Sequence, residues 1–285
     1  MNPYVPFISD FARLKSAGAN LPLGGFHAPA RPVLAPDAPR VLVFSPHPDD
    51  ECLIGALPLR LLRQAGMNVL NVAVTQGSNR ARQAERLKEL QGACDFLGFG
   101  LVQTLPNGLE KISPKGREQD TANWAQAVEI TAGILTEHRP AVVFVPHIGD
   151  WNGTHIGTHL LVLEALEQLP AKFSCFVVET EFWGQMDTPN LMVESTVADV
   201  ADLVAGTSYH VGEVNRNPYH ILLPAWMMDN VRLGGELVGG QGMAVPNFTF
   251  AALYRLNRWR NGELQEVAGA GRVLPASENP AALFE

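Results

Sequence analysis

The residues best suited to chemistry lie in the segment SPHPDDE, residues 45–51. An apolar run, residues 41–44, precedes it and an amphipathic stretch follows it, which is typical of a turn between a strand and a helix. Proteins built from alternating strands and helices place their chemistry in such turns. His47, Asp49 and Asp50 supply one imidazole and two carboxylates within a single turn. These are the components of a hydrolytic zinc site.

A second segment of this character, residues 146–159, follows the apolar run 141–145. It contains Asp150 and three of the chain's eight histidines, which are His147, His155 and His159. The carboxyl ends of neighbouring parallel strands converge on one crevice, so two such turns can share a ligand. The two segments together therefore predict one composite site.

The two motifs resemble those of the LmbE-like (PIG-L) zinc-dependent N-acetylglucosaminyl deacetylase family. The first motif of that family is HPDDE, and the second is a carboxylate followed by spaced histidines. The resemblance continues through an RxxE pattern at Arg86 and Glu89 and a Leu-Gly pair at residues 97–98. It extends over roughly residues 40–160. We interpret Arg86 and Glu89 as structural residues.

The resemblance implies that His47, Asp50 and His155 are the zinc ligands and that Asp49 is the general base. Three protein ligands leave an open position for water, whose pKa zinc can lower to about 7. A neighbouring carboxylate outside the ligand set can accept the proton of that water. Pro48 restricts the backbone between ligand and base, and we expect the start of the following helix to keep both carboxylates ionised.

Asn152 departs from the family pattern, which usually has a histidine three residues before the second-motif ligand. An amide can donate a hydrogen bond to a tetrahedral oxyanion but cannot transfer a proton to a leaving amine. We keep Asn152 and Asp49 as candidate catalytic residues, with Asp49 able to carry the proton itself. Asp150 is expected to act in catalysis by orienting a histidine. Alternative proton donors are His147, His159, His210 and His220.

Substrate contacts are expected from His220 and from Arg80 and Arg82, which follow the second predicted strand. The two arginines fit a solvated helix start equally well. His159 lies one helical turn after His155. We expect it to contact a metal ligand and not to bind the metal itself as a fourth ligand. Aromatic residues that could stack on a sugar ring, or serve only in the core, are Trp183, Trp226 and Tyr219.

Apolar and turn patterns predict alternating strands and helices from residue 40 onward. Strands are expected at residues 40–45, 68–75, 101–105, 141–145 and 173–178. Helices are expected at residues 80–97, 121–137, 155–169 and 51–65, the last with a kink or early end at Pro58. Fully apolar strands indicate a mostly parallel sheet with helices on both faces. This pattern predicts a doubly wound, Rossmann-like α/β architecture, and the resemblance implies that it is of the LmbE-like kind.

We divide the chain into an N-terminal arm, residues 1–39, and a single LmbE-like deacetylase domain, residues 40–285. The arm is rich in Gly, Pro and Ala and is expected to lie extended over the domain. From about residue 180 the periodicity weakens, which predicts a loop-rich C-terminal part. The glycine-rich stretch 233–247 is interpreted as a shaped loop. Whether it is a lid, a subunit contact or an ordinary connection stays open.

Composition restricts the partners of the protein. A formal charge of −8 leaves no basic stripe for nucleic acid or for an anionic membrane surface. No stretch has the length and apolar character of a membrane span, and the N-terminus lacks the basic start of a signal peptide. The three cysteines are scattered without a CxxC pattern, which argues against disulfides and favours a cytoplasmic location. Assembly into a homo-oligomer stays open.

The predicted function is zinc-dependent removal of an acetyl group from an N-acetylated amino sugar or glycoconjugate, with a small-molecule substrate and Zn²⁺ as cofactor. The sugar part of this prediction comes from the resemblance alone. The alternatives are a zinc amidase or esterase for another acyl group and a non-catalytic metal-containing binding protein, which Asn152 suggests. Two histidines and a carboxylate also suit non-haem iron. A nicotinamide cofactor is disfavoured because the first strand leads into SPHPDDE and not into a glycine fingerprint.

Overall fold

The computed structural model describes residues 2–242, 244–267 and 271–285. Within them, one mixed sheet contains β1 (Arg40–Ser45), β2 (Asn68–Ala73), β3 (Gly100–Gln103), β4 (Val142–Pro146), β5 (Cys175–Thr180), β6 (Leu191–Ser195), β7 (Phe250–Arg260), β8 (Glu263–Glu266) and β9 (Arg272–Leu274). The order is β3-β2-β1-β4-β5-β7-β6-β9, and β8 pairs with β7. Strands β1 to β5 are parallel, whereas β7 runs antiparallel to β5 and β6. The predicted mostly parallel α/β sheet is confirmed.

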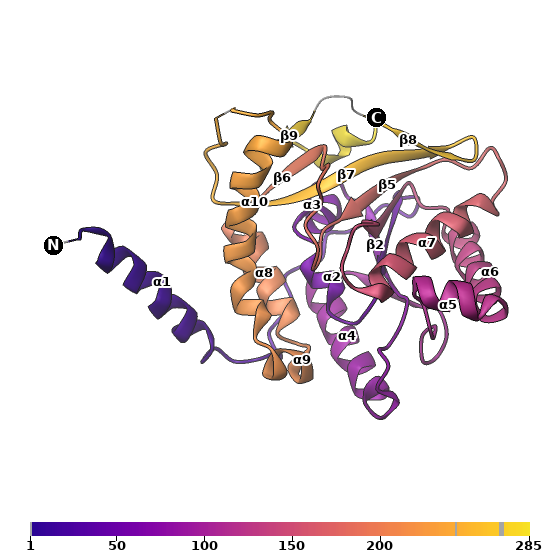
Figure 1. The fold of residues 1–285 in the computed structure, drawn as a ribbon, viewed down its shortest axis with the longest axis horizontal. Helices are drawn as coiled ribbons and strands as arrows, with labels where there is room; N and C mark the ends of the chain where they lie inside the picture. Colours follow the sequence, from indigo (N-terminus) through magenta and orange to yellow (C-terminus); the bar gives the residue numbers. More distant parts are fainter. Residues whose placement is uncertain (1, 243, 268–270) are drawn as a thin grey trace.

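Helices cover both faces of the sheet (Figure 1). They are α2 (Asp50–Leu53), α3 (Leu57–Arg63), α4 (Gln83–Leu97), α5 (Pro114–Gln119), α6 (Thr121–His138), α7 (Gly153–Glu167), α8 (Val197–Thr207), α9 (Val211–Arg216) and α10 (Leu223–Leu237), with 3₁₀ turns η1 (Arg80–Arg82), η2 (Tyr219–Leu222) and η3 (Pro280–Leu283). Val41 and Val43 of β1 join a core with α2, α3, α4 and α8, whereas Leu42 and Phe44 join a second core with α6 and α7. None of the helices in the described part of the chain has the length and hydrophobicity that crossing a membrane requires.

Strands β1 and β4 are neighbours near the middle of the sheet, with Leu42 opposite Val143. The strand order changes direction between them, because β2 and β3 lie beyond β1 whereas β5 lies beyond β4. At such a switch point the loops after the two strands separate and leave a crevice between them. The turns that carry the two predicted motifs both begin at this point, as residues 46–49 and 147–152.

The chain after β1 forms two short helices, α2 and α3, where we expected one helix over residues 51–65. Gly55 lies between them with φ of +87°, and a side chain at this position would collide with Tyr254 of β7. The Tyr254 hydroxyl donates a hydrogen bond to the Ile54 carbonyl, 2.7 Å away, and so satisfies an acceptor at the end of α2. Pro58 is the second residue of α3, in the first turn, and does not end a longer helix.

The expectation of a loop-rich C-terminal part is wrong. The described residues beyond 180 contribute strands β6 to β9 and helices α8 to α10. Strand β7 has eleven residues and is hydrogen-bonded on both sides. Arg255, Asn257 and Arg258 interrupt its apolar residues, so neither a continuous nor an alternating pattern indicates a strand. Pairing with β5 and β6 satisfies the backbone of this strand.

The glycine-rich stretch 233–247 is only partly a loop, because α10 continues into it and contains Gly234 and Gly235. A side chain on Gly234 would lie 2.8 Å from Leu253 of β7 and would collide with β6. Glycine therefore allows α10 to pack closely on the sheet. The loop begins after the helix, and one of its residues, Met243, lies outside the described residues.

The N-terminal segment differs from the predicted extended arm, because Tyr4–Gly18 forms helix α1. Its apolar residues recur at helical spacing, and most Gly and Pro residues of the arm come after it. Helix α1 has no buried residue and projects from the body of the protein (Figure 1). The segment that follows does lie on the domain, where Phe26 packs edge-on against Phe96 and Tyr209.

Removing residues 1–18 should leave the free energy of unfolding unchanged within about 0.5 kcal/mol, because α1 buries no side chain. Removing residues 1–30 should lower it clearly, because this deletion also takes Phe26 out of its aromatic contacts. Urea denaturation of the full chain and the two deletions measures both effects. A large loss from the shorter deletion would mean that α1 packs in solution against a surface that one chain does not supply.

Candidate metal centre

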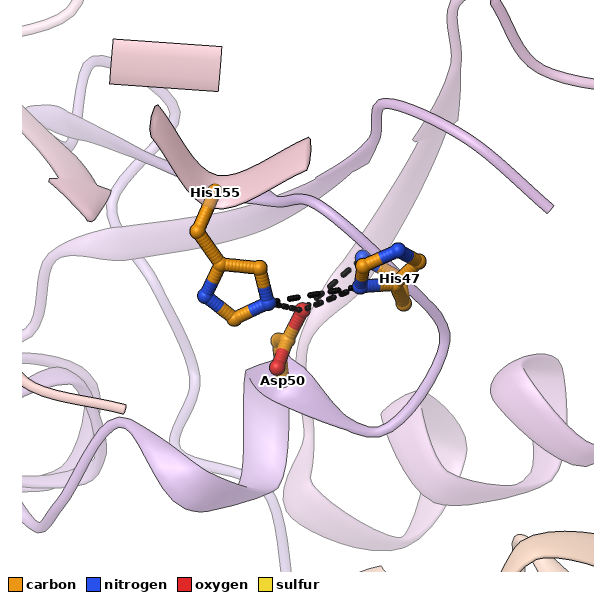
Figure 2. Close-up of side chains that lie close together, drawn as sticks. All are labelled: His47, Asp50 and His155. Atoms are coloured by element: carbon orange, nitrogen blue, oxygen red, sulfur yellow. Dashed lines mark hydrogen bonds and ion pairs between the residues drawn. The ribbon is translucent and has the colours of Figure 1, made fainter. Parts of the chain in front are cut away.

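Three side chains from the two predicted motifs meet at the switch point between β1 and β4 (Figure 2). His47 lies in the turn after β1, Asp50 begins α2, and His155 lies in the first turn of α7. His47 Nδ1 is 3.3 Å from His155 Nε2 and 3.5 Å from Asp50 Oδ2. His155 Nε2 is 3.3 Å from the same Asp50 oxygen. The structure therefore brings together the three residues that were predicted as metal ligands.

The separations of these three atoms fit a tetrahedral metal ion. Zinc binds imidazole nitrogen and carboxylate oxygen at about 2.1 Å, so two of its ligand atoms at tetrahedral positions are about 3.4 Å apart. Asp50 and His155 are buried, whereas His47 is partly exposed. Among the described residues, Asp50 Oδ1 has no hydrogen-bond partner, which leaves a buried acceptor beside the triangle. The donor set and its geometry both suit a divalent cation.

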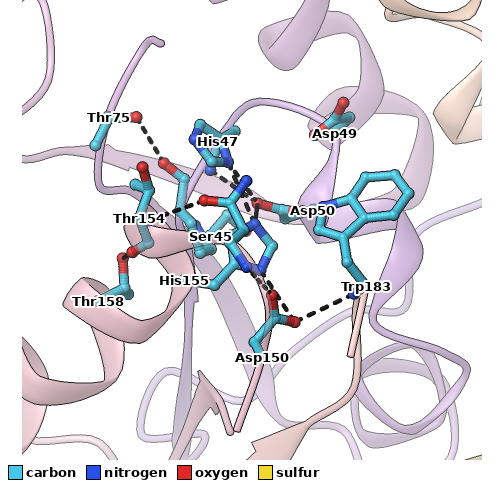
Figure 3. A network of polar contacts seen from close by, with 12 residues as sticks. Ser45, His47, Asp49, Asp50, Thr75, Asp150, Thr154, His155, Thr158 and Trp183 are labelled. Atoms are coloured by element: carbon cyan, nitrogen blue, oxygen red, sulfur yellow. Dashed lines mark hydrogen bonds and ion pairs between the residues drawn. The ribbon is translucent and has the colours of Figure 1, made fainter. Parts of the chain in front are cut away.

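Asp150 supports His155 from the far side of its ring (Figure 3). Its Oδ2 lies 3.6 Å from His155 Nδ1. Its carboxylate accepts hydrogen bonds from the backbone N–H groups of Asn152, Trp183 and Gly184, at 2.8, 3.2 and 3.3 Å. Burial alone would raise the pKa of Asp150, but the contact with His155 and the N–H groups of Asn152 and Gly184 lower it. An ionised Asp150 favours the tautomer of His155 that leaves Nε2 free for a cation.

Asp49 has a strained backbone conformation within the first motif. Its φ of +117° and ψ of −28° lie outside the regions that residues with a side chain usually adopt. Its N–H donates to Glu51 Oε2 at 3.0 Å, and Arg86 donates to the Pro48 carbonyl at 2.9 Å. Glu51 is buried and pairs with His210, 2.7 Å away. These contacts hold the turn that presents two adjacent carboxylates.

The two adjacent carboxylates have opposite pKa shifts, whereas we expected both pKa values to be low. Burial and the nearby Asp50 raise the pKa of Asp49 to about 7. Burial also opposes ionisation of Asp50, but His155 and His47 outweigh it and lower the pKa of Asp50 below its usual value. The expectation of a low pKa is therefore wrong for Asp49, because burial and Asp50 outweigh the side chains that lower its pKa.

Two cavities reach the candidate metal centre, and His47 lines both of them. One has a volume of about 380 Å³, and its walls include Asp49, Arg86, Asn152, Trp183 and Tyr219. The other has a volume of about 410 Å³, and its walls include Thr75, Ser78, Arg80, Lys111 and Thr154. Asp49 lines the smaller of the two, so the predicted base lies beside open space next to the triangle.

The sequence matches a family model described as PIG-L, GlcNAc-PI de-N-acetylase, over residues 42–166, which include both motifs. The predicted resemblance to the PIG-L family is confirmed. No curated protein matches the chain.

Solved structures of low sequence identity share the fold. N,N'-diacetylchitobiose deacetylase from Pyrococcus horikoshii is 18% identical, with a TM-score of 0.54 over 88% of this chain and 92% of that one. The zinc-inhibited form of teicoplanin deacetylase Orf2 is 17% identical, with a TM-score of 0.55 over 78% and 98%. GalB, the 4-carboxy-2-hydroxymuconate hydratase from Pseudomonas putida KT2440, is 16% identical, with a TM-score of 0.53 over 76% and 95%. The fold alone therefore does not select a reaction.

Asn152, where PIG-L proteins usually have a histidine, is the N-cap of α7. Its Oδ1 accepts a hydrogen bond from the Thr154 N–H at 2.8 Å, which leaves its NH₂ group as a donor. It lines the same cavity as Asp49. Asparagine is a preferred capping residue, so the departure from the PIG-L pattern also has a structural reason.

The four histidines considered as proton donors are held elsewhere. His147 and His159 each contact a backbone carbonyl at 2.9 Å. His210 pairs with Glu51, and His220 lines a separate apolar groove beside α8. In the described part of the chain, none of the four lines the cavity that contains the predicted base. The structure thus does not bring His220 to the candidate site, where we predicted a substrate contact.

Arg80 and Arg82 have different surroundings. Arg80 lines the larger cavity and donates to the Glu110 carboxylate at 2.8 Å. Arg82 contacts Glu213 at 3.2 Å and so connects η1 to α9. Arg80 is the one of the pair that faces space a substrate can enter.

Tyr219 is a site residue whose position the sequence analysis missed. Its hydroxyl donates a hydrogen bond to Asp49 Oδ2, and its ring packs edge-on against Trp183 with centroids 5.7 Å apart. Both aromatic residues were considered only as surfaces for a sugar ring or as core. Residue 219 lies beyond the segment that the PIG-L model matches, and no spacing in the sequence connects it with Asp49.

The strain at Asp49 predicts an unusual order of stability for two substitutions. Asp49→Gly should be more stable than Asp49→Ala by about 1 kcal/mol or more, because both remove the carboxylate but only glycine adopts positive φ without strain. At the exposed helical residue Ala125 the order should be reversed, so that Ala125→Gly is less stable than the chain with alanine there. Urea denaturation measures all three variants. Equal stability of the two Asp49 variants would remove the argument from strain.

Proposed function

We propose that this protein is a zinc-dependent hydrolase that removes an acetyl group from an N-acetylated amino sugar or glycoconjugate. The observation that carries the proposal is the triangle of His47, Asp50 and His155 with Asp49 beside it at the wall of a polar cavity. The PIG-L match over both motifs supports the reaction class. The sugar class is supported by the description of that model and by the names of the chitobiose and teicoplanin deacetylases.

His47, Asp50 and His155 would hold the metal ion. When bound, zinc supplies a Lewis acid for the amide carbonyl and lowers the pKa of water. Two nitrogen donors and one oxygen donor at tetrahedral separations favour zinc, although the same donor types also serve non-haem iron. Asp150 keeps His155 in the tautomer that this role needs.

The remaining steps belong to residues of the smaller cavity. Asp49 accepts a proton from the attacking water, since it is a carboxylate within the cavity that does not belong to the ligand triangle. The Asn152 amide donates a hydrogen bond to the oxyanion that forms on the substrate. Asp49 then returns its proton to the leaving amine nitrogen. The proton thereby passes from water to amine, and acetate and a free amino sugar result.

The substrate is a small polar molecule on this proposal. The two cavities that meet at His47 offer hydroxyl, amide and cationic groups, of which Arg80 and Lys111 are the cations of the larger one. Arg82 contacts Glu213, and His220 lines the apolar groove beside α8. Both side chains would have to move to make the predicted contacts with substrate. Three buried free cysteines support a reducing compartment such as the cytoplasm.

Zinc-loaded protein should release acetate from at least one member of a panel of N-acetylglucosamine conjugates, and Asp49→Asn should lose most of this activity. The asparagine is nearly isosteric with aspartate but cannot accept a proton from water. N-propionyl and O-acetyl analogues in the same panel test the alternative of another acyl substrate. Zinc bound at one ion per chain without turnover of any member would instead support a binding protein.

Loss of the support for His155 should weaken metal binding without abolishing it. Asp150→Asn should reduce zinc affinity about 10- to 100-fold, because the amide orients His155 less strongly than a carboxylate does. Asp50→Asn should reduce affinity more, because it removes an anionic member of the triangle. Asp187→Asn, at an exposed position, is the matched control. Competition with a chelator measures the affinities, and an unchanged affinity in Asp50→Asn would contradict the ligand assignment.

A further inference from the structure

The segment that follows α8 is attached to the first motif at three places. His210 Nε2 lies 2.7 Å from Glu51 Oε1, inside the protein. Glu213 Oε1 lies 3.9 Å from Arg86 Nε, and Arg86 also donates to the carbonyl of the turn. The Tyr219 hydroxyl donates to Asp49 Oδ2. A part of the chain outside the PIG-L match therefore supports the turn of the first motif.

Tyr219 itself is firmly located. Its backbone N–H donates to the Asn217 carbonyl at 2.7 Å, and the Asn217 N–H donates to the Glu213 carbonyl at 2.9 Å. Its ring is packed edge-on against Trp183, which comes from the loop after β5. A phenol fixed on both sides can hold a hydrogen-bond partner in one orientation.

We propose that Tyr219 is the positioning residue of Asp49, which it holds by one carboxylate oxygen so that the other faces the water molecule to be activated. This inference rests on the proposed function. Asp49 is nearly buried, with 7% of its surface exposed, and Tyr219 lies on the same cavity wall.

The position of a general base strongly affects the rate of the proton transfer that it catalyses. A general base must lie within hydrogen-bond distance of the proton that it removes, and a displacement of about 1 Å can cost on the order of 100-fold in rate. The Glu51 contact fixes the backbone of Asp49 but not its side-chain torsions. The Tyr219 hydroxyl supplies the constraint on the carboxylate, and it does so without touching the three residues of the metal triangle.

Tyr219→Phe should lower kcat about 10- to 100-fold while KM and zinc affinity change less than about twofold, because only the orientation of the base is lost. Tyr209→Phe is the matched control, since Tyr209 also donates a hydrogen bond, to the Phe26 carbonyl at 2.9 Å, and does not line the cavity of Asp49. It should leave kcat and KM unchanged. A rise in KM alone would mean that Tyr219 binds substrate, and an unchanged kcat would mean that it does not position the base. Either result overturns the proposal.

A second measurement does not depend on activity. Tyr219→Phe should lower the urea midpoint of the wild-type chain but have no effect in an Asp49→Gly background, because its partner is then absent. Tyr209→Phe should lower the midpoint equally in both backgrounds. An equal effect of Tyr219→Phe in both backgrounds would refute the contact. If this coupling is found but no substrate is turned over, the deacetylase proposal fails while the contact between Tyr219 and Asp49 stands.

Discussion

The candidate site depends on one hydrogen bond, from the backbone N–H of Asp49 to the carboxylate of Glu51. Two consecutive aspartates must point to different places, one into the triangle with His155 and one toward a cavity. The chain achieves this with a positive φ at Asp49, a conformation that costs on the order of 1–3 kcal/mol. Glu51 can compensate for this cost only because it is itself buried and paired with His210. The buried contact between Glu51 and His210 therefore supports the geometry of the turn.

Environment gives the two neighbouring carboxylates different properties. Asp50 contacts two imidazoles, so its pKa is lowered and it remains an anion that can bind a cation. Asp49 contacts Tyr219 and borders Asp50, and burial raises its pKa to about 7. A pair of identical groups with separated pKa values is a usual way to divide a ligand or electrostatic role from an acid–base role. Here the two pKa values differ because different residues contact each carboxylate. For Asp50 the main contact that lowers the pKa is His155 of the second motif.

Local rules allowed the centre of the fold and the meeting of the two motifs to be predicted from the sequence, and the resemblance to the PIG-L family singled out the three residues of the triangle. Apolar runs lead directly into His47 and toward His155, and neighbouring parallel strands bring their ends together. The C-terminal part does not obey such rules. Strand β7 contains arginines among its apolar residues and pairs with β5 and β6, and Gly234 lies in a helix where a side chain would collide with Leu253. Tyr219 was missed for the same reason, since only tertiary contacts bring it to Asp49.

Residues inside and outside the PIG-L match both contribute to the candidate site. The triangle and the turn lie within the PIG-L match, so they carry what the chain has in common with that family. The wall of the smaller cavity also includes Trp183 and Tyr219, which lie outside the matched residues. A change in these walls can alter which substrate reaches Asp49 without altering the triangle. Part of the cavity wall beside Asp49 thus comes from outside the matched residues, which is one way in which a single fold can serve different reactions.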